Sequence, residues 1–171
     1  MADVRWDGHS AAELAELTGA ERVSLHERTT STLDVTHALA QEGAPAGTLV
    51  LADEQTGGRG RAGRPWASPP GTGIWLTLLE RPTDESGLPV LSLRAGLRAA
   101  EALSPFAGER VRLKWPNDLY LPAGKLAGIL VEARWREARA EWVAIGFGLN
   151  VVAPADVDRA EIGRASCRER V

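Results

Sequence analysis

Arginine and glycine alternate in the part of this sequence that offers most chemistry, residues 55–66, Gln-Thr-Gly-Gly-Arg-Gly-Arg-Ala-Gly-Arg-Pro-Trp. Glycine lets the backbone take positive φ angles and approach a ligand closely. Arginine stays charged and pairs bidentately with phosphate or carboxylate groups. Successive backbone N–H groups of such a loop can also form an anion-binding concavity. The stretch therefore predicts a pliable loop that binds an anionic ligand.

Two other interpretations fit an Arg-Gly cluster. It could be a plain flexible loop, or a disordered segment that binds nucleic acid through charge and stacking. The flanking residues argue against disorder, because 48–53 and 73–79 both have the apolar pattern of strands. We therefore expect a short loop that is held at both ends by buried β-structure.

A second polar group follows a predicted strand. Apolar residues alternate from Val111 to Trp115, and Pro116 ends this strand and forces the chain to turn. Asn117 and Asp118 then lie at the strand end, where polar side chains can be directed into a pocket. Pro-Asn-Asp is also an ordinary turn sequence, so a structural role remains the alternative.

Lysine is rare in this chain, occurring only at positions 114 and 125 among 20 basic residues. Against such a bias toward arginine, Lys114 and Lys125 suggest sites where a compact, rotatable ammonium is needed, although chance is an alternative. Lys125 opens a predicted strand. A later predicted strand carries Gly146 and Gly148 on one face, where a ligand or another backbone can approach.

The pattern of elements favours an α+β fold, with a mixed, largely antiparallel sheet flanked by helices. Hairpins of 115–120 with 125–136, and of 125–136 with 141–151, account for the antiparallel part. Hydroxyls at Ser31 and Thr32 either cap a helix that runs to about Glu42 or contact a polar ligand. The other predicted elements are a helix opened by a capping box at 10–13, a strand over 22–27 and a scaffold helix over 88–103.

Composition limits the possible functions. The 171 residues, 44% of them apolar, suit one compact domain. A net charge of −3 gives no global attraction to nucleic acid, so we expect no nucleic-acid partner. Without a membrane-length apolar run or a signal peptide, a soluble cytoplasmic protein is expected. One cysteine excludes an internal disulfide, and three scattered histidines lack zinc spacing.

Four motifs together resemble the catalytic domain of bacterial biotin protein ligases. They are Gly-Arg-Gly-Arg-x-Gly-Arg-x-Trp (58–66), Lys-Trp-Pro-Asn-Asp-Leu-Tyr (114–120), Lys-Leu-Ala-Gly-Ile-Leu-Val-Glu (125–132) and Gly-x-Gly-x-Asn (146–150). The resemblance covers about residues 25–152 and implies a fold related to class II aminoacyl-tRNA synthetase cores. It also implies two reactions. Biotin and MgATP give biotinyl-5′-AMP and pyrophosphate, and the adenylate then acylates a lysine of biotin carboxyl carrier protein.

The same resemblance implies roles for individual residues. The catalytic residues would be Lys125, Arg59, Arg61 and Asp118. Biotin would be bound by Ser31, Thr32, Leu33, Gln55, Arg59, Gly60, Arg61, Lys125 and Gly128, and ATP by Arg59, Arg61, Arg64, Trp66, Lys114, Asn117 and Asn150. Family members commonly have asparagine or methionine where Leu33 stands, so only its backbone contact is implied.

The chemistry of the first reaction explains why cationic residues are needed at these positions. The carboxylate of biotin must attack the α-phosphate of ATP, and two anions repel, so cations have to neutralise and align them. Lys125 would meet the carboxylate and the reacting phosphate, and Arg59 and Arg61 would clamp both substrates while the loop excludes water. Trp66 would lie against the adenine. Asp118 would bind Mg²⁺ or ease deprotonation of the acceptor lysine.

The chain also departs from the family pattern. Family members continue after the Gly-x-Gly-x-Asn strand with further core and a small SH3-like domain. Here residues 161–171 resemble the translation of a sequencing adapter, so we expect a catalytic domain over 1–160 that is incomplete at its C-terminal end and lacks the SH3-like domain. Too few residues precede the first helix for a helix-turn-helix domain. Weak stability and reduced or absent turnover are expected.

Two alternative functions remain open. The chain could be an inactive truncated fragment that only binds biotin or nucleotide. It could also be a lipoate ligase or octanoyl transferase relative, which is disfavoured because residues 1–160 contain no Arg-Arg-x-x-Gly-Gly-Gly-type motif and no cysteine nucleophile.

Overall fold

One seven-stranded sheet forms the centre of the molecule. The computed structural model describes residues 4–152, so the predicted boundary at 160 and the segment 161–171 lie outside it. The strand order is β1-β2-β3-β7-β6-β5-β4, and within it only β1 and β2 pair in parallel. The strands are β1 (Arg22–Thr29), β2 (Thr48–Gln55), β3 (Gly73–Glu80), β4 (Arg112–Lys114), β5 (Asp118–Leu121), β6 (Gly124–Arg136) and β7 (Arg139–Asn150). The predicted mixed, largely antiparallel sheet is confirmed.

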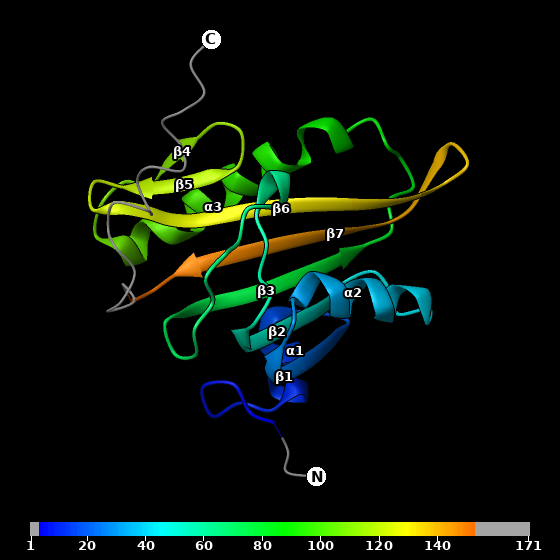
Figure 1. Cartoon of the computed structure of the whole chain (residues 1–171), viewed down its shortest axis with the longest axis horizontal. Coiled ribbons are helices and arrows are strands. Elements are labelled where there is room, and N and C mark those ends of the chain that lie inside the picture. The colour runs from blue at the N-terminus through cyan, green and yellow to red at the C-terminus, as the bar shows by residue number, and fades with distance from the viewer. Residues whose placement is uncertain (1–3, 153–171) are drawn as a thin grey trace.

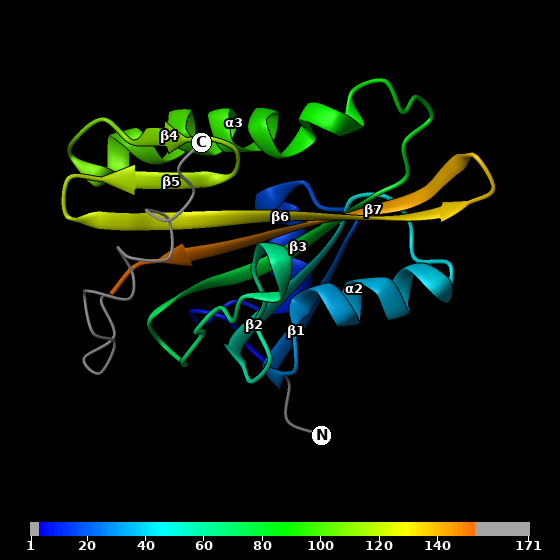
Figure 2. The same cartoon turned by 45° about the horizontal axis from the view of Figure 1, so that its top comes forward.

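Helices cover both faces of this sheet. They are α1 (Ala11–Thr18), α2 (Thr32–Gln41) and α3 (Leu91–Ala107), with short 3-10 turns η1 (Arg61–Gly63) and η2 (Leu88–Val90). Figure 1 shows α2 in front of the sheet and α1 and α3 behind it. Figure 2 shows α3 running alongside β4, β5 and β6, and η1 on the same side as α2. The face shared by α2 and η1 is the one that carries the site.

Local sequence explains where the first two helices begin. Ser10 Oγ accepts a hydrogen bond from Glu13 N, and Ser10 N donates to the Glu13 carboxylate, so the predicted capping box is present. Gly19 ends α1 with a φ of 71°. Ser31 caps α2 by accepting from Leu33 N at 3.3 Å. Both predicted helix starts are confirmed.

Two apolar layers attach the helices to the sheet. On the α2 side, Leu79 and Trp142 pack with alanines of α2 and its following turn. On the α3 side, Ala100 packs against Leu119 and its neighbours. Gly96 allows this approach, because a Cβ there would lie 2.7 Å from Leu113 Cδ1. The glycine that interrupts the helical pattern is therefore a close-packing position.

Some predicted boundaries are wrong. The helix expected over 88–103 starts as the 3-10 turn η2, and the α-helix runs on to Ala107. The strand expected from Val111 to Trp115 ends at Lys114, because Lys114 pairs with Asp118 and the three residues between them form the turn. Trp115 is consequently 77% exposed instead of facing the core. Across residues 4–152, none of the helices combines the length and the apolar character needed to cross a bilayer.

Candidate active site

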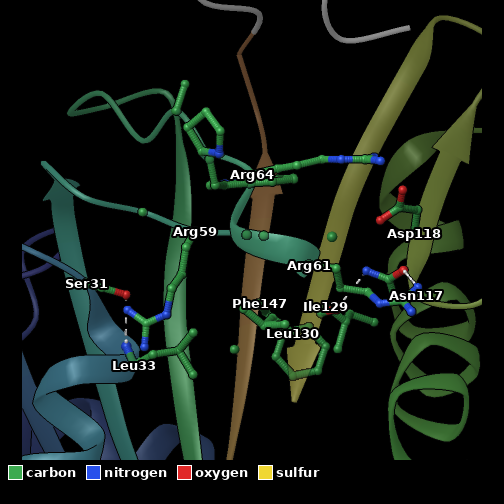
Figure 3. A pocket seen from close by; sticks show the side chains of 18 of the residues that line it. Ser31, Leu33, Arg59, Arg61, Arg64, Asn117, Asp118, Ile129, Leu130 and Phe147 are labelled. Carbon is green, nitrogen blue, oxygen red and sulfur yellow. Dashed lines mark hydrogen bonds between the residues drawn. The ribbon is translucent and has the colours of Figure 1, made fainter. Parts of the chain in front are cut away.

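A cavity of about 690 Å³ lies on the face of the sheet that carries α2 (Figure 3). Its lining comes from six separate stretches of the chain. Every residue to which the resemblance gave a role lies on this lining: Ser31, Thr32, Leu33, Gln55, Arg59, Gly60, Arg61, Arg64, Trp66, Lys114, Asn117, Asp118, Lys125, Gly128 and Asn150. The fold therefore brings the predicted set together around one space of the size that small-molecule sites have.

The glycine–arginine loop, residues 56–72, folds back on itself as an irregular hairpin over the cavity. Trp66 N donates to Gly58 O at 2.8 Å, and Gly60 N donates to Arg64 O at 2.7 Å. The loop is held between β2 and β3, as expected, but over residues 56–72 it is longer than the short loop that the sequence predicted. Of the four glycines in 57–63 only Gly63 has a positive φ, and Ala62 adopts one as well, at 56°.

Trp66 lies flat on a pair of glycines that face each other across two strands. Gly128 on β6 and Gly148 on β7 are direct register partners. A Cβ on Gly128 would lie 2.8 Å from Trp66 Cζ3, and a Cβ on Gly148 would overlap the indole. Because neither position has a side chain, the ring packs directly on the backbone of the sheet. The two glycines thus set the depth of this part of the cavity.

Lys125 stands between a carboxylate and this indole. Its Nζ lies 2.8 Å from Asp118 Oδ2 and 4.9 Å from the centre of the Trp66 ring, and both charged side chains are largely buried. Within residues 4–152, the buried side-chain polar atoms without a hydrogen-bond partner are Trp66 Nε1 and Asp118 Oδ1. Buried polar atoms are normally paired, so these two atoms are exceptions at the cavity wall. Sequence reasoning did not anticipate the Lys125–Asp118 pair.

Arg61 connects the tip of the loop to the opposite wall. Its Nη1 donates to Asn117 Oδ1 at 3.3 Å. Asn117 is itself fixed, because its Nδ2 donates to Ile129 O and its backbone oxygen accepts from Ile129 N, both at 2.9 Å. Figure 3 shows Arg61 and Asn117 meeting across the cavity, while Arg64 points toward Asp118. Arg61 therefore joins the loop to the turn between β4 and β5 across the cavity.

Arg59 faces away from this cluster and toward two carboxylates. Its Nε and Nη2 donate to Glu132 Oε1 and Oε2, both at 2.9 Å, and Nη1 donates to Asp34 Oδ1 at 2.7 Å. Hydrogen bonds from Arg59, with a smaller contribution from His37, hold the pKa of Glu132 below its ordinary value against the opposing effect of burial. All three guanidinium nitrogens are thus engaged by protein groups, and the expected role of Arg59 as a clamp on substrate stays a prediction.

Gln55 ties the start of α2 to the glycine–arginine loop. Its Oε1 accepts from Thr32 N at 2.8 Å and from Thr32 Oγ1 at 3.1 Å, and its Nε2 donates to Ser68 Oγ at 2.8 Å. Thr77 on β3 donates to the same Thr32 hydroxyl. These polar groups therefore hold one another in fixed directions at the cavity wall.

The remaining predicted polar residues lie around the rim. Asn150 Nδ2 donates to Lys125 O at 3.1 Å, which fixes the first residues of β6. Lys114 Nζ lies 5.3 Å from the centre of the Tyr120 ring. Both side chains line the cavity, so their assignment to ATP remains a prediction supported by position.

The apolar end of the cavity was missed by the sequence analysis, except for Leu33. Leu33 packs over Gly146, where a Cβ would lie 3.3 Å from Leu33 Cγ. Leu76, Leu130 and Phe147 add to the lining. Apolar strand residues look alike in sequence whether they face a core or a cavity. The sequence feature that pointed to this end of the cavity was the pair of glycines, Gly146 and Gly148, on one face of β7.

A cavity with an ammonium–carboxylate pair, an arginine-bearing loop and an apolar end has the features of a site for an anionic molecule with an apolar part. The family comparison agrees with this class. The biotin/lipoate A/B protein ligase family model matches residues 25–150, and the chain belongs to that family.

Two curated relatives show how similar this chain is to individual members of the family. The bifunctional ligase/repressor BirA of Bacillus subtilis is 42% identical over 127 residues, covering 74% of this chain and 39% of that protein. The biotin–[acetyl-CoA-carboxylase] ligase of Mycobacterium tuberculosis is 35% identical over 160 residues, covering 88% of this chain and 53% of that protein. The chain therefore spans only part of the length of these curated relatives.

Solved structures agree on the fold. The biotin protein ligase of Aquifex aeolicus in complex with biotin and ATP superposes with a TM-score of 0.69 at 31% identity, covering 84% of this chain and 58% of that chain. The Leishmania major enzyme in complex with biotinyl-5-AMP gives 0.66 at 33% identity, covering 81% and 61%. The expected biotin protein ligase fold, related to class II aminoacyl-tRNA synthetases, is confirmed.

The packing of Trp66 on Gly148 gives a prediction about stability. Gly148→Ala should lower the free energy of unfolding by about 1–3 kcal/mol, because the new methyl group overlaps the indole. In a Trp66→Ala background the same change should cost nothing or stabilise, since alanine suits a strand better than glycine. Urea denaturation of the four variants measures the coupling, and an equal cost in both backgrounds would contradict this packing.

The charges on Glu132 give a prediction about pH. A carboxyl whose pKa is lowered on folding stabilises the folded state above its unfolded value, here 4.5, and loses that contribution as the pH falls through the folded value. Wild type should therefore be more stable than Glu132→Gln at neutral pH, and the difference should shrink below about pH 4.5. Urea denaturation across this range checks the sign, and a pH-independent difference would refute it.

Proposed function

We propose that this chain is the catalytic part of a biotin protein ligase, which joins biotin to a specific lysine of biotin carboxyl carrier protein at the expense of ATP. The observation that carries the proposal is the Lys125–Asp118 pair under the arginine-bearing loop, at one cavity with an apolar end. The printed names of the relatives, and the biotin, ATP and biotinyl-5-AMP in the neighbouring structures, support it.

In the first reaction a carboxylate oxygen of biotin would attack the α-phosphorus of ATP. An acyl–phosphate bond forms, the bond between the α-phosphorus and its bridging oxygen breaks, and pyrophosphate leaves. Lys125 supplies a positive charge on a largely buried wall, where electrostatic stabilisation is stronger than in water. Asp118 holds that ammonium in place until substrate arrives. The Leu33 end of the cavity would take the apolar part of biotin.

In the second reaction the carrier lysine would attack the carbonyl of biotinyl-5′-AMP. A C–N bond forms, AMP leaves, and the attacking amine gives up a proton. Asp118, whose Oδ1 is buried without a hydrogen-bond partner, would ease that deprotonation. Arg61, through Asn117, would keep the loop closed so that water does not reach the acyl-adenylate first.

Magnesium would enter with ATP. Within residues 4–152 no group of three or more His, Cys, Asp or Glu side chains is arranged to hold a metal ion. Mg²⁺ in nucleotide sites is commonly held by one or two carboxylates together with phosphates and water. The free Asp118 Oδ1 fits one such ligand. The ion would neutralise phosphate charge, and Asp118 would orient it.

A carrier protein of a biotin-dependent carboxylase is the proposed partner, and the cytoplasm, where ATP is supplied, is the proposed location. Two alternatives predict different results. An inactive fragment would bind biotin or nucleotide without forming the adenylate. A lipoate ligase or octanoyl transferase relative would prefer a different acyl group.

Lys125→Ala should lower biotin-dependent pyrophosphate exchange by at least about 100-fold, because the neutralising charge is lost. Exchange of label between pyrophosphate and ATP measures adenylation alone, with biotin or lipoate as the acid. Arg98→Ala is the control, since Arg98 forms an exposed ion pair with Glu101 on α3. Exchange retained by Lys125→Ala would remove this lysine from the chemistry. No exchange in wild type would favour the inactive fragment.

Arg61→Gly should release biotinyl-5′-AMP about tenfold faster than wild type, because the hydrogen bond to Asn117 across the cavity is lost and glycine loosens the loop. Rapid gel filtration of enzyme preloaded with labelled adenylate gives the retained fraction over time. A retention time equal to that of wild type would separate Arg61 from loop closure.

A further inference from the structure

Glu132 is the last residue of the 125–132 motif. Neither the resemblance nor the proposed reaction gives it a role. It lies on β6, and its side chain is 30% exposed. Both carboxylate oxygens accept from the Arg59 guanidinium in the bidentate geometry that arginine forms with carboxylates. Arg59 also donates to Asp34 near the start of α2. Two negative charges therefore hold one positive charge.

A second chain of hydrogen bonds fixes Glu132 from the other side. Trp142 Nε1, which can only donate, bonds to His37 Nδ1 at 2.9 Å. His37 must then carry its proton on Nε2, which lies 2.9 Å from Glu132 Oε2. This series of hydrogen bonds runs from Trp142 on β7 through His37 on α2 to Glu132 on β6, and from there to Arg59 on the loop. Glu132 is thus oriented by rigid elements and not by solvent.

We propose that Glu132 is a positioning residue of the ligase reaction, which fixes the Arg59 guanidinium at the cavity wall so that the backbone of the glycine–arginine loop, and not the Arg59 guanidinium, contacts the substrate. The proposal rests on the proposed function. It follows from geometry, since the three Arg59 nitrogens all donate to Glu132 or Asp34. His37 and Trp142 keep the Glu132 carboxylate in the direction that the guanidinium requires.

The anchored side chain has a consequence for the loop. Arg59 lies between Gly58, whose oxygen accepts from Trp66 N, and Gly60, whose nitrogen donates to Arg64 O. Fixing the Arg59 side chain therefore also fixes the two loop segments, around Gly58–Gly60 and Arg64–Trp66, that are hydrogen-bonded to each other beside the cavity. If Arg59 instead met the substrate directly, its guanidinium would have to leave two carboxylates, each of which would then lack its cation.

The test uses the whole 171-residue chain with four variants: Glu132→Gln, Arg59→Lys, the double variant, and Glu54→Gln. Glutamine keeps the shape of Glu132 without its charge, and lysine keeps the charge of Arg59 without its fork. Glu54 is the matched control, because its side chain is also 30% exposed and forms an ion pair, with Arg28 at 3.3 Å.

Two measurements are made on each variant. Trypsin cleavage after Arg59 or Arg61, followed by mass spectrometry, reports loop opening without requiring any activity. For Arg59→Lys the lysine at position 59 is cleaved as well. Pyrophosphate exchange then gives KM for biotin and kcat separately, which distinguishes a positioned binding loop from general loss of structure.

Glu132→Gln and Arg59→Lys should each raise the loop cleavage rate and the KM for biotin about tenfold, with kcat changed by less than about threefold. The double variant should be no worse than either single one, because both remove the same interaction. Glu54→Gln should match wild type. If Glu132→Gln does not fold, Arg59→Lys carries the same test.

Two results would overturn the proposal. One is wild-type loop cleavage in Glu132→Gln. The other is a large fall in kcat in Arg59→Lys alone, which would mean that the guanidinium touches the reacting groups. Absence of exchange in wild type would defeat the proposed function instead, and the cleavage rates would still decide whether Glu132 holds the loop.

Discussion

The packing of one indole on two opposed glycines is the constraint on which the site depends. Trp66 can lie on the sheet only because Gly128 and Gly148 face each other across β6 and β7 without side chains. With the ring seated there, the glycine–arginine loop must cross the cavity instead of standing away from it. The indole also forms one side of the space in which the Lys125 ammonium is held. The path of the loop, the position of the Lys125 ammonium and the depth of the cavity thus all depend on the packing of Trp66 on these two glycines.

Charge in this protein is arranged locally, against a net charge of −3. Inside the cavity Lys125 is paired with Asp118, and Arg61 is tied to a neutral amide. At another part of the cavity wall Arg59 is held by Glu132 and Asp34. The same loop uses one arginine as an anchor and another as a bridge, which a count of basic residues cannot distinguish.

Much of the fold and of the residue set could be predicted from the sequence. Alternating apolar residues located the strands, the Ser10–Glu13 capping box located α1, and the glycine signals of 57–63 located the loop, because each of these depends on interactions between residues close along the chain. Errors arose where pairing across the sheet decided the outcome. The pairing of Lys114 with Asp118 turned Trp115 out to solvent, although its spacing matched a buried position.

The sequence by itself determined the family, the largely antiparallel α+β architecture and the residues that would line the site, because motif order and local periodicity are properties of the chain. Only the tertiary structure decided which charges are partners. Lys125 meets Asp118 from a neighbouring strand, and Arg59 meets a carboxylate 73 positions further along. Such pairings depend on strand register and loop path, which distant packing sets and neighbouring residues do not encode.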